Sequence, residues 1–164
     1  PAKSAKTEVW DGSSWTEVGD LNTARDYPNG AGLTTLGLAI GGRNPGVLAI
    51  TESWNGTSWT EVNDLNTART DIAGAGGSST QALAFAGLEA PRSAKTETWN
   101  GTSWTEVADL ATAKASGAGQ RGTSSSNLAT LFAGGKLPSG SPNYTNQTEE
   151  WNVPVSINNL VFSD

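Results

Sequence analysis

The stretch Thr51–Val62 reads TESWNGTSWTEV, and the chain carries it in three close copies. Thr7–Val18 reads TEVWDGSSWTEV, and Thr96–Val107 reads TETWNGTSWTEV. A fourth copy begins at Thr148 as TEEWNVPV and lacks the second tryptophan. All seven tryptophans of the 164-residue chain fall in this register: Trp10, Trp15, Trp54, Trp59, Trp99, Trp104 and Trp151. Such fixed placement indicates an internal repeat, so we expect a fold built from similar units.

Further marks recur at constant offsets from the tryptophans. Each second tryptophan is followed by the segment DLNTAR, DLNTAR or DLATAK, which ends in the basic residue Arg25, Arg69 or Lys114. A run of glycine and alanine comes next, and then a short apolar run that ends in small residues. The glycines that end these runs are Gly41, Gly42, Gly87, Gly134 and Gly135.

Each unit reads as four short strands separated by turn signals, without a helical period. Asn55-Gly56 and Asn100-Gly101 are expected to form tight type I′ turns, and Asp11-Gly12 the same in the first copy. A small sheet cannot bury two tryptophans by itself, so the pairs are expected to pack against a neighbouring sheet, as in radially stacked blades. The basic residues Arg25, Arg69 and Lys114 are expected to bridge to acids or carbonyls of an adjacent blade. The chain is therefore predicted to be all-β.

The order of these marks resembles the kelch repeat of β-propellers. It is clearest in Arg25, Ile40-Gly41-Gly42, Glu52-Ser53-Trp54 and Trp59. The first aromatic residue is Trp where kelch units usually have Tyr, and the second unit has Ala86-Gly87 in place of a double glycine. The wording WNGTSWTEV-x-DLNTAR also resembles kelch-like repeat proteins of marine bacteriophages.

The resemblance implies a propeller arc of about three four-stranded blades in a single domain, in which the first residues correspond to the second half of a blade. Residues 1–20 would supply strands three and four of a shared blade, and 21–63 and 64–108 two full repeats. Residues 109–152 would form a partial repeat, and 153–164 a C-terminal strand or tail. Three blades cannot close a ring, since propellers use about four to eight. Either a second, head-to-tail copy completes six blades, or the chain is a piece of a longer one.

Composition excludes several function classes. The sequence has no His and no Cys, which removes His- or Cys-based nucleophiles, zinc sites and haem ligation. A net charge of −6 argues against nucleic acid as a partner. No apolar run approaches about 18 residues, so no membrane-spanning segment is expected. No cofactor or metal is expected either: Asp20, Asp64 and Asp109 lack the companions to supply the roughly six to eight oxygens that calcium prefers.

Two repeated features invite functional readings. The tryptophan pairs could stack on sugars, although their place in every unit favours packing between blades. The glutamates that recur at Glu52 and Glu61 resemble a catalytic pair, but one pair in every blade is more typical of structural hydrogen bonding.

The loops that join strands two and three differ between units, which makes them the candidate ligand-binding positions. Loops on a rigid scaffold commonly carry binding, although they could equally be tolerant surface. The candidates are Arg43, Arg92, Lys136 and Tyr144.

The resemblance favours a non-enzymatic binding or structural module, such as a tail-associated protein of a phage virion. Its expected partners are a further copy of itself, other virion proteins or a surface glycan, and its expected location is the virion or otherwise the extracellular space. The alternative is a lectin or sugar-active enzyme of an environmental bacterium. Kelch-like oxidases require a copper site with His, Tyr and Cys, which this chain cannot build.

Overall fold

The computed structural model describes residues 3–89, 91–120, 129–139 and 143–152, and this part of the chain contains strands and no helix. The expectation of an all-β chain is confirmed. The strands are β1 (Glu8–Trp10), β2 (Trp15–Glu17), β3 (Asn29–Leu33), β4 (Leu36–Ile40), β5 (Thr51–Trp54), β6 (Trp59–Val62), β7 (Ala73–Ser78), β8 (Gln81–Phe85), β9 (Thr96–Trp99), β10 (Trp104–Val107), β11 (Ala118–Gln120), β12 (Ala129–Ala133) and β13 (Thr148–Asn152).

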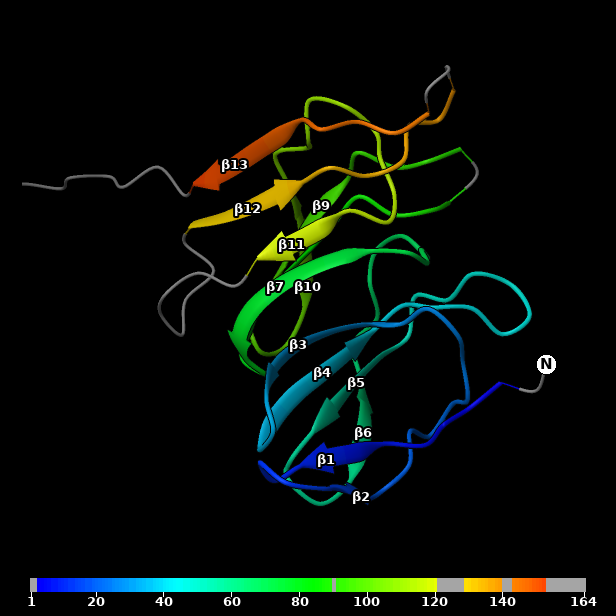
Figure 1. The fold of residues 1–164 in the computed structure, drawn as a ribbon, viewed down its shortest axis with the longest axis vertical. Coiled ribbons are helices and arrows are strands. Elements are labelled where there is room, and N and C mark those ends of the chain that lie inside the picture. The colour runs from blue at the N-terminus through cyan, green and yellow to red at the C-terminus, as the bar shows by residue number, and fades with distance from the viewer. Residues whose placement is uncertain (1–2, 90, 121–128, 140–142, 153–164) are drawn as a thin grey trace, which may run out of the picture.

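The strands form four antiparallel sheets in chain order. The hairpin β1–β2 comes first, followed by the four-stranded sheets β3-β4-β5-β6 and β7-β8-β9-β10, and then by the three-stranded sheet β11-β12-β13. Figure 1 shows them stacked one after another along the longest axis of the molecule. Among the described residues none of the four sheets closes on itself, and the two end sheets have fewer strands than the two central ones.

The hairpins that carry the tryptophan pairs share one geometry. Trp54 is the cross-strand partner of Trp59, and four residues join them. The side-chain Oδ1 of Asn55 accepts hydrogen bonds from the backbone N–H groups of Thr57 and Ser58, each at 2.9 Å. Gly56 has φ of +96°, whereas Asn55 is outside the left-handed region. The expected type I′ turn is therefore wrong, because Asn55 serves as a side-chain acceptor and only the glycine adopts positive φ.

The glycine-rich first strands lie where neighbouring sheets approach most closely. β3 packs against β7, and β7 against β11. A Cβ at Gly119 would lie 2.7 Å from the carbonyl oxygen of Gly74, which is closer than real side chains come. Small residues at these positions are thus required by contact between sheets.

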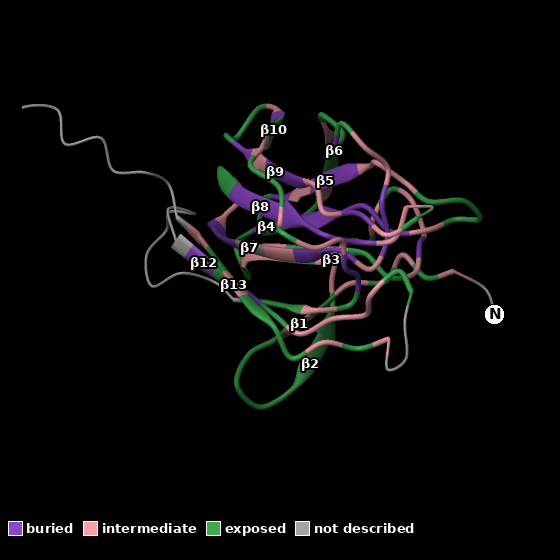
Figure 2. Cartoon of the chain, turned by 90° about the horizontal axis from the view of Figure 1, so that it is seen from above, coloured by how far each residue is buried: buried purple, intermediate pink, exposed green. Residues whose placement is uncertain are grey.

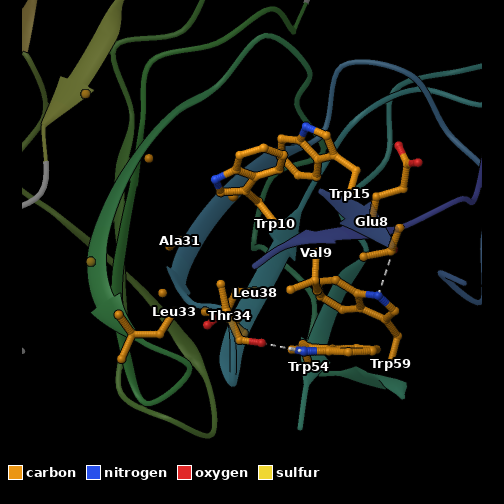
Figure 3. A pocket seen from close by; sticks show the side chains of 17 residues that line it. Glu8, Val9, Trp10, Trp15, Ala31, Leu33, Thr34, Leu38, Trp54 and Trp59 are labelled. Carbon is orange, nitrogen blue, oxygen red and sulfur yellow. Dashed lines mark hydrogen bonds between the residues drawn. The ribbon is translucent and has the colours of Figure 1, made fainter. Parts of the chain in front are cut away.

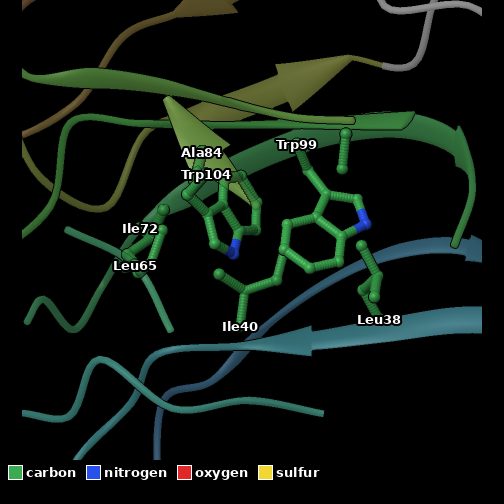
Figure 4. Close-up of a cluster of buried hydrophobic side chains, with 8 residues drawn as sticks. Leu38, Ile40, Leu65, Ile72, Ala84, Trp99 and Trp104 are labelled. Atoms are coloured by element: carbon green, nitrogen blue, oxygen red, sulfur yellow. The ribbon is translucent and has the colours of Figure 1, made fainter. Parts of the chain in front are cut away.

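The hydrophobic core lies between the sheets. Trp99 and Trp104 pack on Leu38 and Ile40 of the preceding sheet, as Figure 4 shows. The next interface is built around Phe85 and Phe132, whose rings meet edge to face at 5.5 Å. Figure 2 shows that burial concentrates in the central strands, while the β1–β2 hairpin at one end is mostly exposed.

Candidate interaction sites

The repeated basic residue is buried inside its own sheet. Arg25 pairs with Glu52 at 2.9 Å and Arg69 with Glu97 at 2.7 Å, and all four side chains are fully buried. We expected these cations to reach an adjacent blade. That expectation is wrong, because each lies just before the first strand of a sheet and reaches the third strand of the same sheet. Each ion pair thus joins the segment before the first strand of a sheet to the third strand of that sheet.

An asparagine completes this arrangement. The backbone N–H and side-chain Nδ2 of Asn66 both donate to Glu97 Oε2, at 2.7 and 2.8 Å. The same Nδ2 also donates to the carbonyl oxygen of Trp104 at 3.0 Å, which ties the fourth strand to the third. Asn22 repeats this pattern in the preceding sheet. Burial lowers the pKa of the Arg69 guanidinium, which the Glu97 carboxylate counteracts.

The buried glutamates Glu52 and Glu97 are therefore held by structural contacts. Glu52 and Glu61 are directly opposed on β5 and β6, but Glu52 is engaged by Arg25 while Glu61 is exposed to solvent. A retaining or inverting glycosidase needs two carboxyl groups free to act on the substrate. This geometry favours the structural reading of the repeated acids.

The last sheet carries a reduced version of the same cluster. Lys114 replaces arginine and meets Glu149 at 2.5 Å, and its ammonium lies 5.2 Å from the centre of the Phe132 ring. Ala111 replaces the asparagine, so only its backbone N–H reaches the carboxylate, at 2.6 Å. The Glu149 side chain is 20% exposed, whereas Glu52 and Glu97 are fully buried.

An aromatic hollow lies beside the N-terminal hairpin. Its volume is about 520 Å³, and Figure 3 shows Trp10 and Trp15 on one side of it, with Trp54 and Leu33 across from them. Trp10 and Trp15 are exposed, although their rings meet at 5.5 Å, much as the other pairs do at 5.3 Å. The first tryptophan pair therefore has the same ring geometry as the other pairs but is more exposed to solvent.

The loop candidates lie on three separate loops, which leave the sheets on the same side in Figure 1. The Arg43 guanidinium lies 5.4 Å from the centre of the Tyr27 ring and 3.5 Å from Asp26. The Lys136 ammonium lies 5.9 Å from the centre of the Tyr144 ring, and both of these residues belong to the third loop. Arg92 is half-buried on the second loop. The structure thus brings Lys136 and Tyr144 together, and places Arg43 and Arg92 on the other two loops.

The aspartates considered for calcium do not gather. Asp109 Oδ1 accepts a hydrogen bond from the backbone N–H of Thr96 at 3.3 Å, which is a structural contact. In the part of the chain that the structure describes, no three His, Cys, Asp or Glu residues come together as metal ligands would. Nor does any described segment form a helix long and apolar enough to cross a bilayer.

The sequence analysis did not identify two recurring hydrogen-bonding residues of the repeat, a threonine and an asparagine. Thr7 and Thr51 accept hydrogen bonds from the indoles of Trp59 and Trp104, each at 3.0 Å, and so link one sheet to the next. Asn22 and Asn66 bind the buried glutamates. Their recurrence at fixed offsets was the available signal. A scan against protein-family models finds no family that matches the chain, and no curated protein matches it either.

Proposed function

We propose that this protein is a non-enzymatic binding and structural module, and that its sheets are blades of an open kelch-like β-propeller arc. The observation that carries the proposal is that the recurring residues form the contacts between sheets and within them. Tryptophan–threonine bonds connect successive sheets, and an arginine–glutamate–asparagine cluster holds each of the two four-stranded sheets together. The residues that differ between units lie in the loops, where binding to a partner would be specified.

The arc is completed, in this proposal, by a second copy that brings the total to six blades. The strand counts support it, because the first described sheet has two strands and the last described sheet has three. Head-to-tail association of identical copies would cover both ends at once. Light scattering at micromolar concentration should then report about twice the 16.9 kDa chain mass. A monomer at all concentrations would contradict the six-blade ring.

The biological setting we propose is a phage virion, with the chain in a tail-associated component that contacts the host surface or other virion proteins. It rests on the resemblance of WNGTSWTEV-x-DLNTAR to kelch-like phage proteins. Antibodies raised against the purified chain should label the tails of marine phage particles in electron micrographs. Labelling confined to bacterial cells would favour the alternative setting.

A carbohydrate-binding role is the second candidate, and the aromatic hollow favours it. Exposed indole faces such as those of Trp10 and Trp15 can stack on sugar rings. A glycan array would detect such binding, and a panel of glycosides would detect hydrolysis. Turnover of any glycoside that is lost on replacing a repeated glutamate would overturn the non-enzymatic proposal.

A further inference from the structure

The interfaces between sheets repeat one hydrogen bond, and the series lacks a member at its end. Trp59 donates to Thr7 in the preceding sheet, and Trp104 donates to Thr51. The next threonine in the series is Thr96, which is 1% exposed. Within the described residues its hydroxyl has no hydrogen-bond partner. A buried hydroxyl without a partner is unfavourable, so a donor that reached this position would be stabilised there.

The matching donor stands at the opposite end of the chain. Trp15 occupies the same place in its hairpin as Trp59 and Trp104, yet it is 64% exposed while Trp104 is 5% exposed. The fourth copy of the repeat cannot supply the missing indole, because it has Ser156 where the others have their second tryptophan. Among the described residues, the Thr96 hydroxyl is thus an acceptor without a donor, and Trp15 is an indole without cover.

The charges at the two ends match in the same way. Glu8 occupies the place of Glu52 and Glu97, but it is exposed and forms no ion pair with any described residue. At the far end, Lys114 has Glu149, whose side chain is less completely buried than Glu52 or Glu97. The sequence Thr-Glu-x-Trp is shared by β13 and by Thr7 together with β1, so both segments carry a glutamate at the position that pairs with Lys114 in β13.

The apolar surfaces also correspond. Leu131 on β12 is exposed, whereas Leu38 and Leu83 at the equivalent places on β4 and β8 are buried against the next sheet. The aromatic hollow lies between the two-stranded β1–β2 hairpin and the sheet β3-β4-β5-β6, and glycines of β7 and β11 complete its lining. Strands β11 and β12 of another copy would fill this hollow, and the lining of the hollow would then cover Leu131 of that copy.

We propose that the Thr7–Val18 hairpin of a second copy takes the place of β13 beside β12, so that Trp15 of that copy donates its indole N–H to Thr96 Oγ1 and Glu8 of that copy pairs with Lys114. The exchange replaces one Thr-Glu-x-Trp segment with another and adds a fourth strand to the three that the described residues form in the last sheet. This joint rests on the self-association in the proposed function and names the residues that form it. The recognition mode is strand addition, with a side-chain hydrogen bond setting the register.

A double-mutant cycle tests the joint. Thr96→Val and Trp15→Phe should each raise the dimer dissociation constant at least fivefold, since each removes one hydrogen bond per joint. The two substitutions together should cost no more than either alone. Thr51→Val is the matched control, because it removes the equivalent acceptor inside the chain and should leave the dissociation constant within about twofold.

Engineered cysteines test the strand exchange directly, and the chain has none of its own. Leu131 pairs with Glu150 on β13, and Val9 is the equivalent residue on β1. Mixed Leu131→Cys and Val9→Cys chains should form an intermolecular disulfide under mild oxidation. The double variant Leu131→Cys/Glu150→Cys should instead close within one chain, hold β13 beside β12 and so prevent dimerisation. Mixed chains that do not cross-link, or a closed double variant that still dimerises, would overturn the joint.

The outcomes separate this joint from the proposed function. A dimer whose dissociation constant is unchanged by Thr96→Val and Trp15→Phe overturns the joint while self-association stands. A chain that remains monomeric to millimolar concentration overturns both the joint and the six-blade ring. Glycoside turnover overturns the non-enzymatic proposal and leaves the joint as measured.

Discussion

The indole Nε1 of Trp104 donates a 3.0 Å hydrogen bond to the hydroxyl of Thr51, which lies 53 positions earlier on the neighbouring sheet. Both groups are buried, so the bond fixes how far one sheet is rotated and shifted against the next. The tryptophan also belongs to the apolar cluster at this contact. A single residue type thus provides both the cohesion and the register of the interface between sheets.

Replacing Trp104 separates these two contributions. Trp104→Phe keeps an aromatic ring but leaves the Thr51 hydroxyl buried without its donor, so we expect a loss of about 1–3 kcal/mol in the free energy of unfolding. Trp104→Ala also opens a cavity and should cost about 3–5 kcal/mol. Urea denaturation followed by circular dichroism measures both values.

Trp59→Phe is the control for this pair, since it removes the same bond to Thr7 at a half-buried position. Water can replace the lost donor there, so the cost should be smaller than for Trp104→Phe. Equal costs at the two positions would show that the hydrogen bond does not depend on burial as we argue.

Arg69→Lys tests the fork geometry of the buried cation. Arg69 donates to the carbonyl oxygens of Ala86 and Lys95, at 2.9 and 2.7 Å, in addition to Glu97. A lysine ammonium keeps the charge but cannot reach all three acceptors in one plane. We expect a loss of about 2–3 kcal/mol, measured by denaturation. Arg69→Met, which leaves Glu97 without any partner charge, should cost about 3–5 kcal/mol.

Arg43→Lys is the matched surface control. The Arg43 side chain is 43% exposed, and its guanidinium lies 3.5 Å from Asp26. Exposed ion pairs contribute little, so this substitution should change stability by less than about 0.5 kcal/mol. A similar loss for Arg43→Lys and Arg69→Lys would argue against a special role for the buried site.

Equivalent glycines should differ in their tolerance of a side chain. Gly41 has φ of +61°, and a Cβ there would lie 2.5 Å from the carbonyl oxygen of Arg69 and 2.6 Å from a methyl group of Ile72. Gly134 has φ of +69°, but its nearest contact is 3.5 Å away. Gly134→Ala should thus cost about 1 kcal/mol from the backbone alone. Gly41→Ala should cost more, because the neighbouring sheet must move; equal thermal shifts would contradict this.

Ala86 shows that a side chain can occupy this kind of position. It holds φ of +61° in the second unit, where the first and third have glycine, and it is fully buried. Ala86→Gly should relieve the backbone but lose a buried methyl group, so we expect stability to change by less than about 1 kcal/mol.

The sequence predicts the strands and their grouping because tryptophan and glycine signals recur at fixed offsets. It predicts burial less well. The segment SWTEV is identical in the first three copies, yet Trp15 is exposed, Trp59 is half-buried and Trp104 is buried. The exposed fraction of each tryptophan depends on the sheet that packs against it. The local sequence does not specify that neighbouring sheet.

Other features lack a sequence signal because different residue types perform one role. Tyr27, Asp71 and Ser116 all adopt φ between 52° and 56°, two residues after each buried cation. None is glycine, so no turn pattern marks them. The sequence also did not predict that each arginine pairs with a glutamate of its own sheet. Spacing along the chain does not show toward which sheet a long side chain extends.

Asp11 gives the first hairpin a dependence on pH that the other hairpins lack. Its Oδ1 accepts backbone hydrogen bonds from Ser13 and Ser14 at 2.7 and 2.8 Å, the role that Asn55 performs in the next unit. These bonds, that of Ser14 first, hold the pKa of the Asp11 carboxyl well below its ordinary value. A carboxyl with a lowered folded-state pKa stabilises the fold fully above its unfolded pKa of about 3.9, and loses that contribution as pH falls toward the folded value.

Asp11→Asn should therefore remove this acid sensitivity without disturbing the turn. An amide oxygen can accept the same two backbone bonds, as Asn55 and Asn100 do, and it does not titrate between pH 2 and pH 7. We expect the melting temperature to fall less between pH 7 and pH 2 in Asp11→Asn than in the wild-type chain. Asn55→Asp should have the opposite effect, adding acid sensitivity to the second hairpin. Identical pH profiles for the three proteins would show that protonation of this turn does not affect folding.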